Sequence, residues 1–356
     1  MTQWDEATFR GQVQDELDGF LDRQAEVLAP LGSDAQRLLA QARASVAGGK
    51  RFRAAFCYWG YRAFAEPGDA WTATALIRAC AALELLQASA LIHDDYMDGS
   101  DSRRGRPATH RHFEAQHAEF GWTGPSTTYG AAGAILLGDL LLAWADELLR
   151  RTGFGWDVLG PALEIFDLCK TEVIAGQFLD VSVQARAEAD VATAMTVLRY
   201  KSAKYSIERP IHIGAALAGA TPDQIAALSG FGLPIGEAFQ LRDDILGVFG
   251  DPAATGKPAG DDLVEGKRTV LVAHALAGAP DADAALLDRS LATALSDAEV
   301  DRLRAIITDS GALDAVEETI TALTATADAA LAGLAIAEPA RAALAALGDA
   351  ATQRSV

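Results

Sequence analysis

Residues 91–106 read LIHDDYMDGSDSRRGR, and residues 239–251 read FQLRDDILGVFGD. Each stretch carries an aspartate pair, Asp94-Asp95 in the first and Asp243-Asp244 in the second, directly after apolar residues. Charged carboxylates beside apolar surface are costly unless they are paired or bind a metal ion. Two such pairs in opposite halves of the chain indicate two banks of oxygen ligands facing a shared cavity. Oxygen ligands of this kind suit magnesium, which usually also binds substrate phosphates.

The first motif has helical spacing. Asp94 and Asp98 are four residues apart and are expected on one helical face, whereas Asp95 points about 100° away and supports the cluster or contacts a cation. The alternative is an acidic helix end exposed to water, although the helix dipole disfavours carboxylates there and a metal ion would offset that cost. We interpret His93 as a histidine that packs in the core or supports a neighbouring site residue, rather than as a metal ligand or a base.

Basic residues gather near these motifs although the chain carries a formal net charge of −19. They are Lys50, Arg51 and Arg53 after Gly48-Gly49, then Arg103, Arg104, Arg106, Lys201, Lys204, Lys257, Lys267 and Arg268. Arginine binds phosphate oxygens bidentately and lysine binds them as a point charge. A metal with several cations implies a small polyanion, and a diphosphate fits best. Surface salt bridges are the alternative for the arginine-rich loop.

The pattern of apolar residues predicts an all-α protein of about a dozen helices. The 356 residues show no linker or break in composition, so we expect a single domain over 1–356. The expected helices span 5–28, 34–47, 51–65, 70–98, 112–120, 131–151, 157–183, 190–203, 205–219, 222–250 and 269–278, followed by Ala/Leu-rich helices to the end, with polar loops over 101–111 and 252–268.

The composition excludes several partners. A pI near 4.6 argues against nucleic acid, which requires a basic surface. The most apolar windows, 73–92 and 131–149, contain charged residues, so core helices explain them better than stable membrane insertion. Three separated cysteines and no evident signal peptide predict a cytoplasmic protein.

Several short motifs together resemble a known family. GGKRFR at 48–53, DDYMD at 94–98 with RRGRP at 103–107, GD at 138–139, GQFLD at 176–180, KS at 201–202 and FQLRDD at 239–244 follow the order and approximate spacing of the trans-isoprenyl diphosphate synthases. The resemblance covers about residues 45 to 270. It implies an isoprenoid synthase-like helical bundle around a central catalytic cavity, a homodimer, and a prenyltransferase that condenses isopentenyl diphosphate with dimethylallyl, geranyl or farnesyl diphosphate.

The resemblance also assigns roles to residues. Three magnesium ions, or Mn²⁺ as a substitute, would be bound by Asp94, Asp98 and Asp243, with Asp95 and Asp244 in support. The allylic diphosphate would be held by Arg103, Lys201 and Lys257, and Ser202 and Lys267 are further candidate substrate-binding residues. The diphosphate of isopentenyl diphosphate would be held by Gly49, Lys50, Arg53 and Arg104. Gln240 would orient the site, and Gln177 and Asp180 would stabilise developing positive charge.

The second motif departs from the family pattern, because its third acid is replaced by Gly247. Asp243, Gly247 and Asp251 are spaced by four, so Asp251 is a candidate metal ligand from the next turn, with water at Gly247. Pro252 argues against this, because it disfavours helical geometry at the preceding residue.

Two other functions remain as alternatives. The spacing of this second motif also resembles class I terpene cyclases, but a cyclase would not need the second diphosphate site that GGKRFR and RRGRP indicate. A non-catalytic subunit of a heteromeric synthase would be expected to lose these motifs.

Residues before the first motif bear on product length. In the family, bulky residues about a turn before the first aspartate close the tunnel for the growing chain. Ser89 and Ala90 are small, and Leu85 and Leu86 lie one turn further. We therefore expect geranylgeranyl diphosphate as the product.

Overall fold

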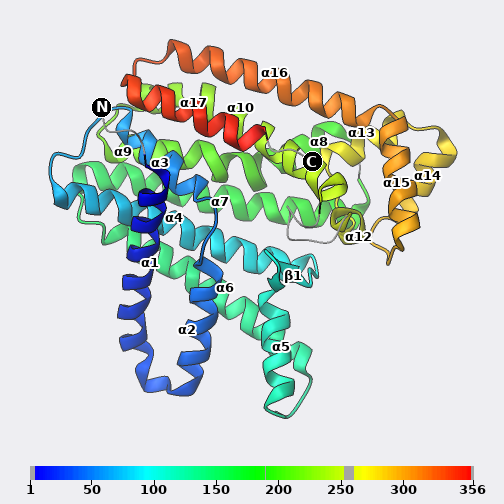
Figure 1. The fold of residues 1–356 in the computed structure, drawn as a ribbon, viewed down its shortest axis with the longest axis horizontal. Helices are drawn as coiled ribbons and strands as arrows, with labels where there is room; N and C mark the ends of the chain where they lie inside the picture. The colour runs from blue at the N-terminus through cyan, green and yellow to red at the C-terminus, as the bar shows by residue number, and fades with distance from the viewer. Residues whose placement is uncertain (1–4, 189, 252–259, 354–356) are drawn as a thin grey trace. The chain divides into compact units, whose positions relative to one another are not determined.

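The computed structural model describes residues 5–188, 190–251 and 260–353. Helices account for nearly all of the secondary structure in these ranges (Figure 1), so the all-α prediction is confirmed. The chain divides into two compact units, Met1–Leu163 with Ile213–Ala220, and Glu164–His212 with Thr221–Val356. A single domain over the whole chain stays a prediction.

The first unit is built around one long apolar helix, α4. Its elements are α1 (Glu6–Leu28), the 3₁₀ turn η1 (Ala29–Leu31), α2 (Ser33–Val46), α3 (Phe52–Arg62), α4 (Ala70–Met97), β1 (Ser102–Arg103), β2 (Arg106–Pro107), α5 (Thr109–Glu119), α6 (Ser126–Arg150) and the start of α7 (Trp156–Arg186). Among the described helices, only α4 is long and apolar enough to cross a membrane. Because 78% of its most apolar window is buried in the protein, it is a core helix.

A two-residue hairpin replaces part of the polar loop expected after the first motif. β1 pairs antiparallel with β2, and the two residues between them, Arg104 and Gly105, have φ of 53° and 70°. Positive φ at both central positions is the geometry of a type I′ turn, which suits glycine and strains arginine slightly.

The second unit packs helices around α10. Its further elements are α8 (Val191–Val197), η2 (Leu198–Glu208), α9 (Arg209–Leu217, whose last five residues belong to the first unit), α10 (Pro222–Phe249), α12 (Asp261–Glu265), α13 (Val270–Gly278), α14 (Asp281–Ser290), α15 (Asp297–Asp309), α16 (Ala312–Gly333) and α17 (Glu338–Thr352). α10 contacts η2, α16 and α17, and one core cluster joins Leu241 and Ile245 to Leu271 and Val316.

Helix α10, which carries the second aspartate motif, has defined ends. Thr221 and Gln224 form a reciprocal capping box at its start. It ends at Phe249, and Gly250 follows in extended conformation with ψ of 149°. The second motif therefore lies in the last two turns of a rigid helix.

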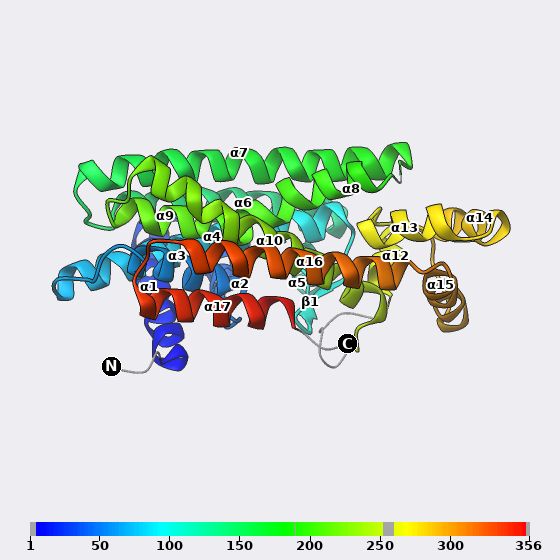
Figure 2. The ribbon, with the colours of Figure 1, turned by 90° about the horizontal axis from the view of Figure 1, so that it is seen from above.

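Segment η2 is a π-helix, in contrast to the two separate α-helices expected over 190–203 and 205–219. It spans Leu198–Glu208 and joins α8 to α9 in one continuous helix. Figure 2 shows α8, the start of this helix, running beside α7. π-Helical turns are rare and frequently occur at functional sites.

Candidate active site

The first aspartate cluster lies at the C-terminal end of α4. Asp98 caps the helix, its backbone N–H donating to the carbonyl of Asp94 at 2.8 Å. Asp95 is buried, and its carboxylate accepts from Arg103 Nε at 2.8 Å. Arg103 Nη2 also lies 3.8 Å from the Asp94 carboxylate. The expected support role of Asp95 toward a cation therefore agrees with the geometry: Asp95 holds the guanidinium group beside Asp94.

The Gly48-Gly49 turn approaches the arginine hairpin. A Cβ on Gly49, which has φ of 91°, would lie 3.3 Å from Arg104 Nη1, so only glycine allows this approach without strain. Partial removal from water lowers the pKa of Arg104, and repulsion from Arg51, Arg103 and Arg53 lowers it further against the attraction of Glu84. This concentration of guanidinium groups is suited to bind an anion.

Arg51 differs from the other cations of this turn. It is buried, its Nη1 donates to Glu84 at 2.8 Å, and its Nη2 donates to Gln14 and to the carbonyl of Val46, both at 2.6 Å. Arg51 therefore ties α3 to α1, α2 and α4, whereas Lys50 is exposed and its Nζ lies over the Phe52 ring, 6.0 Å from the centroid.

His93 is packed against α6. Its Nε2 lies 3.2 Å from the Ile135 carbonyl and 3.6 Å from Asp139, and a Cβ on Gly138 would overlap its ring. The interpretation of His93 as a packed residue agrees with these contacts, and Gly138 is the residue that makes room for it.

The second aspartate cluster lies on α10. Asp244 is buried and accepts from Gln240 Nε2 at 2.9 Å, one helical turn earlier. Burial raises the pKa of Asp244 well above its ordinary value. Asp262 and Asp243 raise it further, against the hydrogen bond from Gln240 and the attraction of Lys267. Several carboxylates grouped in this way are stabilised by a cation.

Asp262, at the start of α12, was not among the site residues predicted from the sequence. A Cβ on Gly247 would overlap the Asp262 carboxylate, so that carboxylate, rather than water, occupies the space over Gly247. Lys267 Nζ lies 3.2 Å from Asp262 and 2.5 Å from Glu265. The sequence contained a hint of this carboxylate: the third acid of the second motif is replaced by Gly247, and an acidic pair, Asp261-Asp262, follows shortly after.

The helical argument for Asp251 is wrong. α10 ends at Phe249, so Asp251 lies beyond the helix in exposed chain and does not share a helical face with Asp243. Lys257, the other residue expected near this end, lies outside the described residues.

The KS motif lies on the π-helix, facing α7. Lys201 Nζ donates to the Asp180 carboxylate at 2.6 Å, and Ser202 is buried. Gln177 precedes Asp180 by one turn of α7, and its amide nitrogen is buried without a hydrogen-bond partner. Asp180 is therefore paired with the lysine that the family resemblance assigns to the allylic diphosphate.

The residues of the expected tunnel floor all lie on α4. Leu85, Leu86 and Ser89 are buried, and Ala90 is half-buried. Within the described residues, no group of three or more His, Cys, Asp or Glu side chains is arranged to hold a metal ion. Asp94 and Asp98 nevertheless offer the hard oxygen donors that magnesium prefers.

Comparisons with known proteins agree with these features. A family model described as polyprenyl synthetase matches residues 35–308. A geranylgeranyl diphosphate synthase of Mycobacterium tuberculosis is 36% identical over 263 residues, covering 72% of this chain and 68% of the relative. A geranylfarnesyl diphosphate synthase of Natronomonas pharaonis is 33% identical over 259 residues, covering 72% of this chain and 69% of the relative. The crystal structure of geranylgeranyl pyrophosphate synthase from Corynebacterium glutamicum, complexed with isoprenyl diphosphate and magnesium, superimposes with a TM-score of 0.95 at 39% identity, covering 99% of this chain and 100% of that chain.

Proposed function

This chain belongs to the polyprenyl synthetase family and is a trans-prenyltransferase, and we propose that it condenses isopentenyl diphosphate with an allylic diphosphate to give geranylgeranyl diphosphate. The observation that carries the proposal is the first aspartate cluster, in which buried Asp95 holds Arg103 beside Asp94. A carboxylate pair with an adjacent, oriented guanidinium group suits a metal-bound diphosphate better than any neutral ligand.

The metal ligands we propose are Asp94, Asp98 and Asp243. Magnesium bound by these carboxylates would supply positive charge to the leaving diphosphate. Buried Asp244, held by Gln240, would support the second cluster. Use of magnesium is supported by the Corynebacterium glutamicum structure, whereas three ions and substitution by Mn²⁺ are proposals from the family resemblance.

Two sets of basic residues would form separate binding sites for the two diphosphates. We propose that Arg103, Lys201 and Ser202 bind the allylic diphosphate. Lys257 is assigned there by resemblance alone, and Lys267 is proposed only as a substrate-binding residue. Gly49, Lys50, Arg53 and Arg104 would bind isopentenyl diphosphate, and the close approach of Arg104 to Gly49 supports this assignment. Fixed cations aimed at the bridging and terminal oxygens stabilise the charge that develops as the allylic C–O bond breaks. The double bond of isopentenyl diphosphate then attacks the allylic cation and forms the new C–C bond. The resulting cation loses a proton to the departed diphosphate, which restores a double bond in the product.

Product length rests on α4. Small Ser89 and Ala90 would leave the tunnel open one turn before Asp94, and Leu85 and Leu86 would close it. Two of the relatives are named for products longer than farnesyl, geranylgeranyl and geranylfarnesyl diphosphate, and a third, 32% identical over 228 residues, is named a farnesyl pyrophosphate synthase.

We also propose a homodimer in the cytoplasm. The part of α7 in the second unit exposes a row of large apolar side chains at helical spacing, Ile174, Phe178 and Val181, of which Phe178 is 74% and Ile174 57% exposed. An apolar row on a folded helix is typical of an interface between subunits. Light scattering after gel filtration would report the mass, and charged substitution of Phe178 is expected to give monomer.

Product analysis tests the function. Purified protein with magnesium and isopentenyl diphosphate would receive dimethylallyl, geranyl or farnesyl diphosphate in separate reactions, followed by mass spectrometry. A dominant linear geranylgeranyl product supports the proposal, and longer products refute only the tunnel argument. A cyclic hydrocarbon formed without isopentenyl diphosphate indicates a cyclase, and activity that appears only with a second chain indicates a partner subunit.

A further inference from the structure

Three residues on one face of α7 contact the π-helix η2. Glu172, Gly176 and Asp180 are spaced by four on α7 and therefore share a face. Lys201 Nζ donates to Asp180 at 2.6 Å, and Lys204 Nζ donates to Glu172 at 2.6 Å. Gly176, which lies against the backbone of η2, is therefore flanked on α7 by two residues that form ion pairs with η2.

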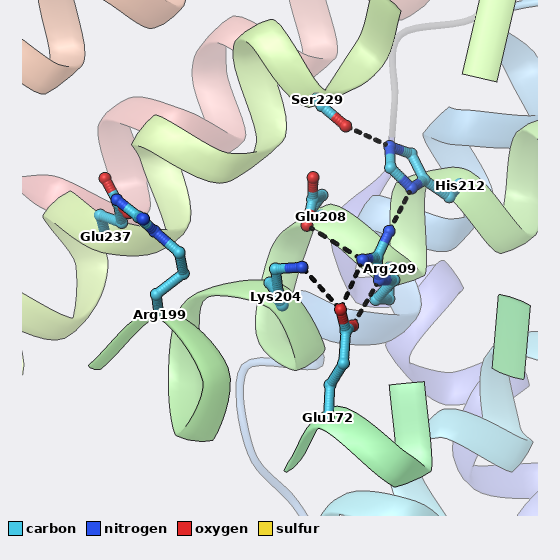
Figure 3. Close-up of polar contacts among 8 residues, drawn as sticks. All are labelled: Glu172, Arg199, Lys204, Glu208, Arg209, His212, Ser229 and Glu237. Atoms are coloured by element: carbon cyan, nitrogen blue, oxygen red, sulfur yellow. Dashed lines mark hydrogen bonds and ion pairs between the residues drawn. The ribbon is translucent and has the colours of Figure 1, made fainter. Parts of the chain in front are cut away.

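Glu172 accepts hydrogen bonds from two cations, Lys204 and Arg209, that the π-helical geometry brings together. Besides Lys204, it accepts from Arg209 Nε at 2.7 Å and Arg209 Nη2 at 2.8 Å (Figure 3). Lys204 and Arg209 are five residues apart, which in an α-helix would put them about 140° apart around the axis. The wider turn of the π-helix brings both cations onto one face, where a single carboxylate accepts from both.

Glycines allow η2 to lie close to its neighbours. A Cβ on Gly176 of α7 would overlap the backbone of Tyr200 and Lys201, and a Cβ on Gly236 of α10 would overlap the backbone of Ala203. Because the backbone of η2 is in contact on both sides, a change of register would move Lys201 relative to α7.

The ionic group around Glu172 is buried and balanced in charge. Although burial alone would raise the pKa of Glu172, hydrogen bonds from Arg209 and Lys204 bring it below its ordinary value. Glu208 lies 3.8 Å from Arg209, and Arg209 Nη1 donates to His212 Nδ1 at 3.2 Å. Removal of one partner from a buried pair leaves a charge without compensation, so this group favours one arrangement strongly.

We propose that Glu172 is a positioning residue for the allylic substrate: by holding Lys204 and Arg209 together it maintains the π-helical register that sets the position of Lys201. This inference rests on the proposed function, in which Lys201 binds the allylic diphosphate. Glu172 itself contacts no substrate in this assignment and acts through η2.

Glu172→Gln, with Glu237→Gln as the matched control, tests the inference. Glu237 on α10 is equally buried and accepts from Arg199 of η2 at 2.6 Å, so its loss also breaks an ion pair to the π-helix (Figure 3). Glu172→Gln is expected to raise KM for geranyl diphosphate about tenfold, the effect of weakening one charge-assisted hydrogen bond, with KM for isopentenyl diphosphate within about twofold. Glu237→Gln is expected to lower the melting temperature without changing the ratio of the two KM values.

The outcomes separate the inference from the proposed function. Should Glu172→Gln fail to fold, Lys204→Gln, which keeps the bidentate Arg209 contact, is expected to raise the allylic KM by a smaller factor. An active wild-type chain whose variants keep the wild-type allylic KM, or in which Glu237→Gln raises it equally, overturns the inference alone. A wild-type chain that forms no prenyl product overturns the proposed function and this assignment together.

Discussion

The neutral histidine at the end of the buried ionic group makes stability depend on pH. His212 lies against Arg209, and burial, together with repulsion from that guanidinium group, lowers its pKa from 6.5 to about 3. Since Arg209 can only donate, His212 Nδ1 must accept, and Nε2 then carries the hydrogen that faces Ser229 Oγ at 3.2 Å. Protonation of His212 would remove this acceptor and place a second cation beside Arg209.

The sign and size of the effect follow from linkage. The pKa in the folded state is the lower one, so the unfolded chain binds a proton first, and stability is lost as the pH falls from about 6.5 toward about 3. Each pKa unit corresponds to about 1.4 kcal/mol, so about 2 kcal/mol of the free energy of unfolding should be lost by about pH 5. Glu172 contributes little to this loss above about pH 5, because the stability that its lowered pKa provides is lost only as the pH falls below its ordinary value of 4.5.

Urea unfolding at about pH 7.5 and about pH 5, followed by circular dichroism, measures this loss. The control is His212→Asn, whose side-chain oxygen can still accept from Arg209 but does not titrate. The wild-type chain should lose about 2 kcal/mol more than the variant between the two pH values. Equal losses in the two proteins would refute the argument that His212 is held neutral by its surroundings.

Three further substitutions test separate contacts. Asp95→Asn should lower kcat/KM for the allylic substrate about tenfold, because Arg103 loses a charge-assisted hydrogen bond; an unchanged value in steady-state assays would contradict the support role. Gly247→Asp, which restores the family's third acid, should reduce activity and melting temperature, because its side chain would overlap Asp262; a gain in activity would show that Asp262 moves aside readily. Glu84→Gln should cost about 3–5 kcal/mol in urea unfolding by leaving its arginine partner buried without a counter-charge, and a loss under about 1 kcal/mol would count against that pair.

The helices and the aspartate clusters could be predicted because both depend on local periodicity. The expected helix over 222–250 agrees with α10 to within one residue, since its capping box and apolar face are local features. The π-helix could not be predicted in this way. Its register depends on Glu172 and Gly176, which lie on another helix and leave no trace in the spacing of residues 198–208.

The sequence allowed us to predict which residues belong to the candidate site, but not all of the contacts that they make. The interpretation of His93 as packed agrees with its place against Gly138. The argument for Asp251 failed because a helical face was extrapolated past the true end of α10 at Phe249. Asp262 was not predicted because it lies on a separate helix, α12, whose approach to Gly247 cannot be inferred from the spacing of residues within the motif.

The cations near the aspartate motifs illustrate why a cluster of lysines and arginines cannot be read directly as a phosphate site. Arg51 pairs with Glu84, which is 33 residues away in the sequence, and Lys204 pairs with Glu172, which is 32 residues away. Lys267 pairs with nearby acids, whereas Arg51 and Lys204 are each satisfied by a carboxylate from a different helix. An unpaired cation close to others is destabilised by repulsion and by loss of water, so a protein that gathers cations for a diphosphate must orient most of them with carboxylates of its own. The anion site is therefore specified as much by these buried acids as by the basic residues that would touch the substrate.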